Sequence, residues 1–208
     1  MKVLIVLLAA ISLAACSTPP PHKFVADPDK RWEQRKTELS EINDWLLSGR
    51  VAIVNTHESW HLNMKWQKHD DKYILDLSGP FGAGHAQLTG TKEGVLLVDA
   101  DQRSFYADNP DQLLQEVTGV RMPVQSLLYW IRGLSNNNIK KDKQMLDNYG
   151  RLALLEQAGW SVRFKSYVDI EQHEMPQKIF IDGSDLKVKI FIEEWNLKSK
   201  TFQFDNEG

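Results

Sequence analysis

Histidines are the first residues of this sequence to consider for catalysis or metal binding. Six are present: His22, His57, His61, His69, His85 and His173. None lies in an HExxH motif or another paired arrangement of metal ligands, and the chain has no Gly-x-Ser-x-Gly motif. On a strand, the four-residue spacing of His57 and His61 separates them by about 13 Å, too far for a shared metal. We interpret the histidines as solvent-facing polar residues and predict no metal site and no cofactor.

Two pairs of adjacent acidic residues, Asp70-Asp71 and Glu193-Glu194, could in principle supply acid and base groups. Neighbouring side chains on a strand or turn usually point apart, so we expect these to be solvated charges at a turn and at the rim of the fold. Because no residue pattern supports catalysis, we predict that the protein is not an enzyme. A membrane-anchored hydrolase is the weakest alternative.

The single cysteine, Cys16, is the residue best placed for a chemical modification. It follows a Leu-Ala-Ala run, and cleavage before it would leave a thiol at the membrane surface, ready to receive a diacylglyceryl group. With no second cysteine, no disulfide can form within the chain. The run resembles the lipobox of bacterial lipoproteins; the alternative is a plain secretory signal with an incidental cysteine.

The residues around Cys16 fit this interpretation. Lys2 supplies a short positive region, and residues 3–15 are uncharged but too few for a membrane-spanning helix, which needs about 20 apolar residues. We therefore predict a removed signal peptide at 1–15 and a lipidated, Pro-rich, flexible tether at 16–29. Bacterial lipoproteins kept in the inner membrane typically carry Asp after the cysteine. Ser17 stands there instead, so by resemblance we expect the outer membrane.

The remaining residues predict one domain at 30–197 and a C-terminal tail at 198–208. With 25 Lys and Arg against 28 Asp and Glu, and no dense basic run, nucleic acid is not an expected partner. A first amphipathic helix is expected to begin near residue 30. Its apolar face would be formed by Trp32, Leu39, Ile42 and Leu46.

From residue 47 onward the apolar residues follow a period of two, which is typical of strands. The pattern is clearest where Trp60, Leu62, Met64 and Trp66 alternate with polar residues. Turn-forming residues at 69–71, 78–82 and 90–94 then separate short predicted strands at 73–78, 85–89 and 95–99. Such a series is typical of antiparallel hairpins in a curved sheet.

Two helices are predicted to interrupt the strands. Asn109-Pro110 begins the first, which ends at Gly119, and Pro123 begins the second, which ends at Gly133. A polar segment follows at 135–148, and strand periodicity resumes at Trp160 and continues to residue 192. The strands have one apolar and one polar face, which predicts a mainly β fold, a closed or nearly closed antiparallel barrel.

The seven tryptophans are the most unusual feature of the apolar faces. Trp60, Trp66 and Trp160 share the apolar faces of their strands. They are either part of a large core or the lining of a cavity for a hydrophobic ligand, since helices across a barrel mouth leave space that side chains need not fill.

Five stretches together resemble a known family: WLLSGRVAIVNTHESWHLNMKWQ at 45–67, SGPFGAGHAQLTG at 78–90, DNPDQLLQEVTGVRMPVQSLLYWIRG at 108–133, QAGWSV at 157–162 and MPQKIFI at 175–181. They follow one another as in the LolB family of outer-membrane lipoprotein receptors, over roughly residues 32–197. The resemblance implies an incomplete, unclosed antiparallel barrel with about three helices covering an apolar cavity, as in LolA and LolB. It also implies that the protein takes acylated lipoproteins from a LolA-like periplasmic carrier and inserts them into the outer membrane.

The resemblance also assigns candidate site residues. We assign the cavity lining to Trp60, Leu62, Met64, Trp66, Tyr73, Leu75, Leu77, Leu88, Trp130 and Trp160. LolB-like proteins carry an exposed apolar residue, commonly Leu, on a protruding loop that engages the membrane. Here the loop is Gly79-Pro80-Phe81-Gly82, so the resemblance assigns membrane contact to Phe81. The alternative is that its ring folds back onto the barrel.

The expected protein is thus a lipid-anchored monomer on the periplasmic side of the outer membrane, with Cys16 as its attachment site and acyl chains as its ligands. An outer-membrane scaffold or sensor that holds a hydrophobic or protein ligand without transferring it is the alternative.

Overall fold

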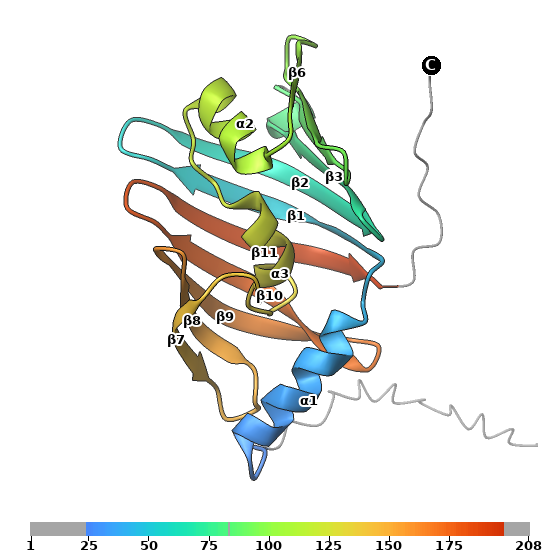
Figure 1. The fold of residues 1–208 in the computed structure, drawn as a ribbon, viewed down its shortest axis with the longest axis vertical. Helices are drawn as coiled ribbons and strands as arrows, with labels where there is room; N and C mark the ends of the chain where they lie inside the picture. Colours follow the sequence, from blue (N-terminus) through green and yellow to red (C-terminus); the bar gives the residue numbers. More distant parts are fainter. Residues whose placement is uncertain (1–23, 83, 198–208) are drawn as a thin grey trace, which may run out of the picture.

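A computed structural model describes residues 24–82 and 84–197. Its strands form one eleven-stranded antiparallel sheet that curves around three helices, which lie on its concave side (Figure 1). The strand order is β6-β5-β4-β3-β2-β1-β11-β10-β9-β8-β7. Because β6 and β7 are the two edges and do not pair with each other, the barrel is unclosed. The incomplete antiparallel barrel with three helices is confirmed, and a fully closed one is wrong.

The elements have the following bounds. The helices are α1 (Pro28–Ser40), α2 (Pro110–Thr118) and α3 (Val124–Trp130), with a short 3-10 turn η1 (Pro80–Gly82). The strands are β1 (Trp45–Val54), β2 (Ser59–His69), β3 (Lys72–Ser78), β4 (Ala86–Gly90), β5 (Val95–Val98), β6 (Ser104–Ala107), β7 (Lys141–Leu146), β8 (Leu152–Gln157), β9 (Trp160–Ile170), β10 (His173–Asp182) and β11 (Lys187–Asn196).

Strand β1 joins the two halves of the sheet. It pairs with β2, its neighbour in the chain, and with β11, which is the last strand. Since directly paired residues present their side chains to the same face, the pairs Val51–Leu62 and Val51–Ile190 continue one apolar row across this junction. The core of the protein is therefore the concave face of a single continuous sheet.

The ends of the helices follow local sequence signals. The Asn109 side chain accepts hydrogen bonds from the backbone N–H groups of Asp111 and Gln112 at the start of α2, and Gly119 ends it with φ of 72°. The Asp27 side chain accepts from Lys30 N at the start of α1. Side-chain oxygens at the N-cap and a left-handed glycine at the C-cap satisfy terminal backbone groups. None of the helices in the described ranges is both long and apolar enough to cross a membrane.

The first predicted helix extends too far. Helix α1 ends at Ser40, so Ile42 follows it and Leu46 belongs to β1. The apolar spacing was compatible with a helix across this boundary, but the polar residues Asn43 and Asp44 favour a turn there, and Trp45 begins a central strand instead.

Three strands were not predicted. Strand β6 has only four residues, too few to show a period, and β8 is nearly continuously apolar at its start. Strand β7 lies within the segment 135–148 that we assigned to no element. Its sequence KDKQML is mostly exposed because it forms a sheet edge, where a strand needs no apolar alternation.

The predicted tether overlaps residues that contact the domain. Val25 N donates to the Asn148 carbonyl at 3.0 Å, and the rings of Phe24 and Tyr149 lie 5.2 Å apart. Residues 24–29 are thus attached rather than unpacked as expected. The signal peptide, Cys16, Ser17 and the C-terminal tail lie outside the described residues.

The junction between β1 and β11 depends on Gly49. A Cβ atom there would lie 2.2 Å from the Phe191 carbonyl oxygen, next to the bulge at which the register shifts between Ser48 and Gly49. Since a backbone atom cannot move aside cheaply, we expect Gly49→Ala to lower the free energy of unfolding by about 1–3 kcal/mol in urea denaturation. Ser48→Ala is the matched control and should change it little; equal stability of Gly49→Ala and the unsubstituted chain would contradict this account.

Candidate functional site

The predicted cavity residues lie together on the concave side of the sheet. On adjacent strands, Trp66 pairs with Leu75 and Leu75 with Leu88, which places all three on one face. Trp60, Leu62, Met64 and Trp66 share this face of β2, and Tyr73, Leu75 and Leu77 share it on β3. Trp160 lies on β9 two residues from the buried Val162, and α3 supplies Trp130.

These ten residues differ in burial. Met64, Trp66, Tyr73, Leu88 and Trp130 are buried, whereas Trp60, Leu62, Leu75, Leu77 and Trp160 are half-buried. The half-buried residues of β2 lie toward the β1–β2 turn, and the buried ones toward the opposite end. The concave face is therefore more open at the β1–β2 turn.

A cluster of tryptophans closes the other end. The ring of Trp45 lies edge-on to those of Trp66 and Trp195, with centroids 5.5 and 6.0 Å away. Trp195 Nε1 donates to the Pro176 carbonyl, but the buried Nε1 atoms of Trp45 and Trp66 have no acceptor among the described residues. We did not assign Trp45 or Trp195, although both lie on strands with alternating apolar residues that could have identified them.

Helix α3 is fixed over this face by a buried amide. Trp130 Nε1 and Asn136 N both donate to Gln157 Oε1 at 3.0 Å. Gln157 Nε2 in turn donates to the carbonyls of Asn136 and Ile139, each at 2.8 Å. One side chain of β8 thus satisfies four polar groups and holds the end of α3 in place.

A buried arginine ties α3 to α1. Arg132 follows α3 and donates to the carbonyls of Leu39 and Ile42 at 3.2 and 2.9 Å, and to that of Leu128 at 3.1 Å. The Leu39 and Ile42 carbonyls lie at or just beyond the C-terminal end of α1, where a cation interacts favourably with the helix dipole. Burial lowers the pKa of the Arg132 guanidinium.

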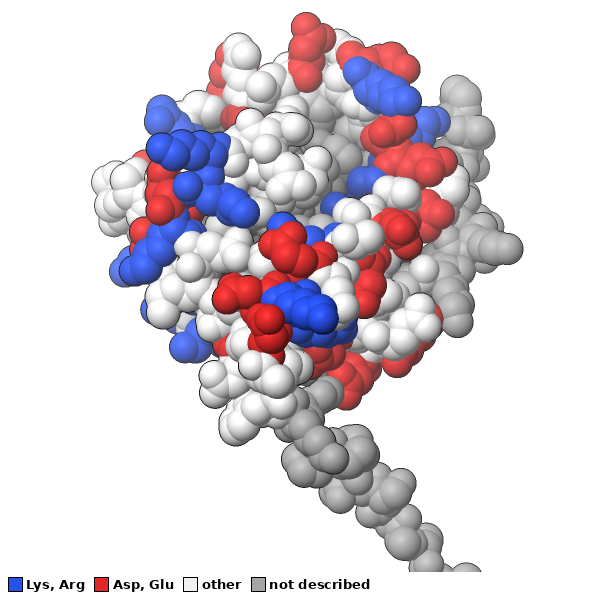
Figure 2. Space-filling view, turned by 60° about the horizontal axis from the view of Figure 1, so that its bottom comes forward, with Lys and Arg blue, Asp and Glu red and all other residues white. Residues whose placement is uncertain are grey.

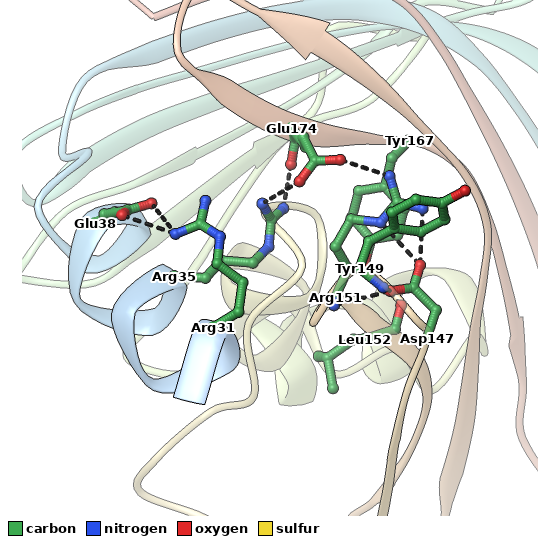
Figure 3. A network of polar contacts seen from close by, with 9 residues as sticks. All are labelled: Arg31, Arg35, Glu38, Asp147, Tyr149, Arg151, Leu152, Tyr167 and Glu174. Atoms are coloured by element: carbon green, nitrogen blue, oxygen red, sulfur yellow. Dashed lines mark hydrogen bonds and ion pairs between the residues drawn. The ribbon is translucent and has the colours of Figure 1, made fainter. Parts of the chain in front are cut away.

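A second polar network attaches α1 to β9 and β10 (Figure 3). Arg35 donates to the Glu174 carbonyl, and Arg151 bridges the Glu174 and Asp147 carboxylates at 2.7 and 2.8 Å. Both guanidinium groups lie against the Tyr167 ring, at 5.3 and 4.5 Å from its centroid. Burial raises the pKa of Tyr167 and lowers that of Arg35. The network positions the helix.

A polar groove of about 760 Å³ opens between the C-terminal end of α1, α3 and two turns of the sheet. Its charged lining residues are Lys36, Lys68, Asp70, Asp71, Asp108 and Arg132. Figure 2, which brings the α1 end forward, shows charges of both signs on this side of the molecule. Of the ten residues predicted to line the cavity, only Tyr73 lines this groove. The groove therefore suits a polar group better than an acyl chain.

The predicted membrane loop forms the 3-10 turn η1 between β3 and β4. Gly79 is buried, Pro80 and Gly82 are exposed, and Gly82 has φ of 80°, a conformation that suits glycine. The side chain of Phe81 lies outside what the structure describes, so its exposure stays a prediction.

The candidates for metal binding and catalysis are dispersed. Within 24–82 and 84–197, no three His, Cys, Asp or Glu residues are grouped to hold a metal ion. His57 lies in the turn between β1 and β2, not on a strand as we assumed. Asp71 pairs with Lys92 and Glu193 with Arg50, each at 2.7 Å. Asp71 lies in a turn as expected, whereas Glu193 lies on the central strand β11 and not at the rim.

The sequence matches known proteins over most of its length. The family model described as outer membrane lipoprotein LolB matches residues 43–195. A protein of Nitrosococcus oceani named outer-membrane lipoprotein LolB is 34% identical over 184 residues, covering 88% of this chain and 92% of that protein. One of the same name from Stutzerimonas stutzeri is 32% identical over 190 residues, covering 90% and 92%.

Solved structures with a similar fold include a LolA superfamily protein from Nitrosomonas europaea. Its TM-score is 0.55 at 9% identity, with 85% of this chain and 96% of that chain covered. A putative outer membrane lipoprotein-sorting protein domain from Vibrio parahaemolyticus has a TM-score of 0.56 at 10% identity, with the same coverage. At such identities the likeness concerns the fold alone.

The amide of Gln157 gives a direct test of how α3 is held. Gln157→Ala would leave two buried donors and two carbonyls without this partner, so we expect the free energy of unfolding to fall by about 2–4 kcal/mol in urea. Gln125→Ala, on the exposed side of α3, should change it by less than about 0.5 kcal/mol. If both variants were equally stable, the amide would not be the anchor of the helix.

Proposed function

Because the chain belongs to the LolB family of outer membrane lipoproteins, we propose that it receives lipid-modified lipoproteins from a LolA-like periplasmic carrier and inserts them into the inner leaflet of the outer membrane. The observation that carries this proposal is the concave sheet face, whose aromatic and aliphatic rows are covered by α2 and α3. Such a face suits an acyl chain, which needs apolar contact along its length. The receptor acts as a monomer and needs neither a cofactor nor a catalytic residue.

The physical need for a receptor follows from the cargo. Exposing an acyl chain of about 15 methylenes to water costs on the order of 12 kcal/mol, at about 0.8 kcal/mol per methylene. The sequence has no phosphate-binding Gly-x-x-x-x-Gly-Lys loop with which to use a nucleotide. Transfer therefore proceeds downhill, from the carrier to this receptor and on to the bilayer, each site binding more favourably than the last.

The acyl chains enter where the concave face is more open. The half-buried side chains Trp60, Leu62, Leu75, Leu77 and Trp160 make the first contacts, and the buried members of the predicted lining are reached as the covering helices move. Helix α2 is displaced from the sheet more easily than α3. Among the described residues, Asp111 of α2 accepts from Val124 N of α3, and no hydrogen bond ties α2 to the sheet.

Two buried indole groups add a polar element to the lining. The Nε1 atoms of Trp45 and Trp66 lack acceptors in the described part of the chain, and a buried donor without a partner is unfavourable. Both rings lie at the closed end of the concave face, away from the end at which the acyl chains enter, so they contribute apolar contact for the far ends of the chains.

Release depends on the loop at η1. We assign membrane contact to Phe81, whose neighbours Gly79, Pro80 and Gly82 form the tight turn. The lipid on Cys16 holds the receptor at the outer membrane, so the loop and the concave face act where the cargo is needed.

A scaffold or sensor that binds a hydrophobic or protein ligand without transferring it is the second candidate. Such a protein would bind its ligand on the same apolar face, but it would not need a loop that contacts the membrane.

Depletion of the protein distinguishes the two candidates. We expect outer-membrane lipoproteins to accumulate in the periplasm bound to a carrier, as measured by fractionation, and the unsubstituted chain to restore their localisation. Leu75→Glu, which places a charge on the apolar row, should fail to restore it, whereas Ile74→Glu on the opposite face of β3 should succeed. Normal localisation after depletion would favour the scaffold.

The loop is tested by Phe81→Glu. A charge at this place opposes entry into the bilayer, so we expect the variant to fold and to accept cargo from the carrier but to deliver at least about tenfold less to vesicles. Phe81→Leu is the matched control and should deliver normally. Full delivery by Phe81→Glu would show that the loop does not engage the membrane.

A further inference from the structure

The convex face of the sheet carries a groove of about 610 Å³ that the proposed function does not use. It crosses four adjacent strands, β10, β11, β1 and β2. Two rows of paired residues form most of it: Lys178, Phe191, Arg50 and Asn63 in one, and Phe180, Lys189, Ala52 and His61 in the other. Between the rows lie Val51, Leu62 and Ile190, and Pro80 completes the lining.

The groove combines an apolar base with a basic rim. Phe180, Phe191 and Ala52 supply apolar surface, and among its described lining residues there is no Asp or Glu. Lys178 and Lys189 are exposed, and each ammonium lies over a phenylalanine ring, 5.5 Å from Phe191 and 5.6 Å from Phe180. Neither has a carboxylate partner among the described ion pairs.

Two arginines beside the groove are already neutralised. Arg163 pairs with Asp182 at 2.6 Å, and Arg50, on the rim, pairs with Glu193 at 2.7 Å. Among the residues that line the groove, the two lysines are thus the cations available to an incoming ligand. An anionic group between them would gain electrostatic attraction while its apolar part contacts the two rings.

One residue links this groove to the membrane loop. Pro80 of η1 lines its β2 side, where Asn63 pairs with Ser78 at the end of β3. A surface that contacts η1 therefore also reaches the groove. This continuity favours a bilayer over an acidic protein as the occupant.

We infer that the convex groove around Lys178, Lys189, Phe180 and Phe191 docks on anionic phospholipid headgroups of the membrane that receives the cargo. The inference rests on the proposed function, because it supplies the orientation in which η1 meets the bilayer. The lysines bind the lipid phosphates, and the rings contact the glycerol and upper acyl region. The concave face then lies on the side of the sheet away from the docked bilayer.

The test is vesicle binding by the chain from residue 16 onward with Cys16→Ala, so that no acyl anchor contributes. Vesicles of phosphatidylethanolamine with about a quarter phosphatidylglycerol should bind the protein, and vesicles of phosphatidylcholine should bind it much less. Lys178→Glu/Lys189→Glu should weaken binding to the anionic vesicles at least about tenfold. High salt should have a similar effect.

Lys141→Glu/Lys143→Glu is the matched control, since it makes the same change in net charge on the exposed edge strand β7. It should retain most of the binding. If both double variants lost binding equally, the effect would come from net charge alone and the inference would be wrong. Unchanged binding by the groove variant would also overturn it.

Transfer of cargo from the carrier in solution separates this inference from the proposed function. The groove variant should accept cargo as the unsubstituted chain does. If it bound vesicles normally but lost acceptance, the groove would be a site for the carrier protein, and the inference would be wrong. If the unsubstituted chain accepted no cargo yet bound anionic vesicles through the groove, the proposed function alone would fail.

Discussion

One constraint governs the rest of the structure: the concave face of the sheet is too apolar to be left in water, yet a receptor must not seal it permanently. Burial of large side chains contributes about 1.5–3 kcal/mol each, so this face drives folding. An antiparallel sheet can bury one face and expose the other, which makes an unclosed barrel a natural solution. The three helices then take the place that further strands hold in a closed barrel.

The helices are held with unequal strength. Helix α1 is fixed by the Arg35 and Arg151 network, and α3 by Gln157 and Arg132. These ties use buried polar groups, which are costly to break because each partner would be left unpaired. Helix α2 packs against β5, β6 and α3 and buries Leu113, but the described residues tie it to another element by one hydrogen bond, from Val124 N to Asp111. The covering layer thus has a firm part near the tryptophan cluster and a looser part near the more open end.

Much of the fold could be predicted from local patterns. Period-two rows located β2 and β3, and Asn109-Pro110 with Gly119 located α2 closely. The errors arose where tertiary context decides: β7 is polar because it is an edge, and Leu46 belongs to β1 despite its helical spacing. The ten residues predicted to line the cavity lie on the concave side, but their unequal burial could not be predicted. The burial of each side chain depends on which helix covers its row. The position of α3 is fixed by Gln157 and Arg132, which lie elsewhere in the chain.

The two faces of the sheet cannot vary independently, because successive residues of a strand point to opposite sides. On β11, Val188 and Ile190 face the core while Lys189 and Phe191 face the convex groove. A shift of register by one residue would put the lysine in the core and the isoleucine outside. The close backbone approach at Gly49 limits how β11 can lie against β1. The register that completes the apolar interior therefore also places the basic rim, so one strand pairing positions both the surface proposed for the acyl chains and the surface proposed for the membrane.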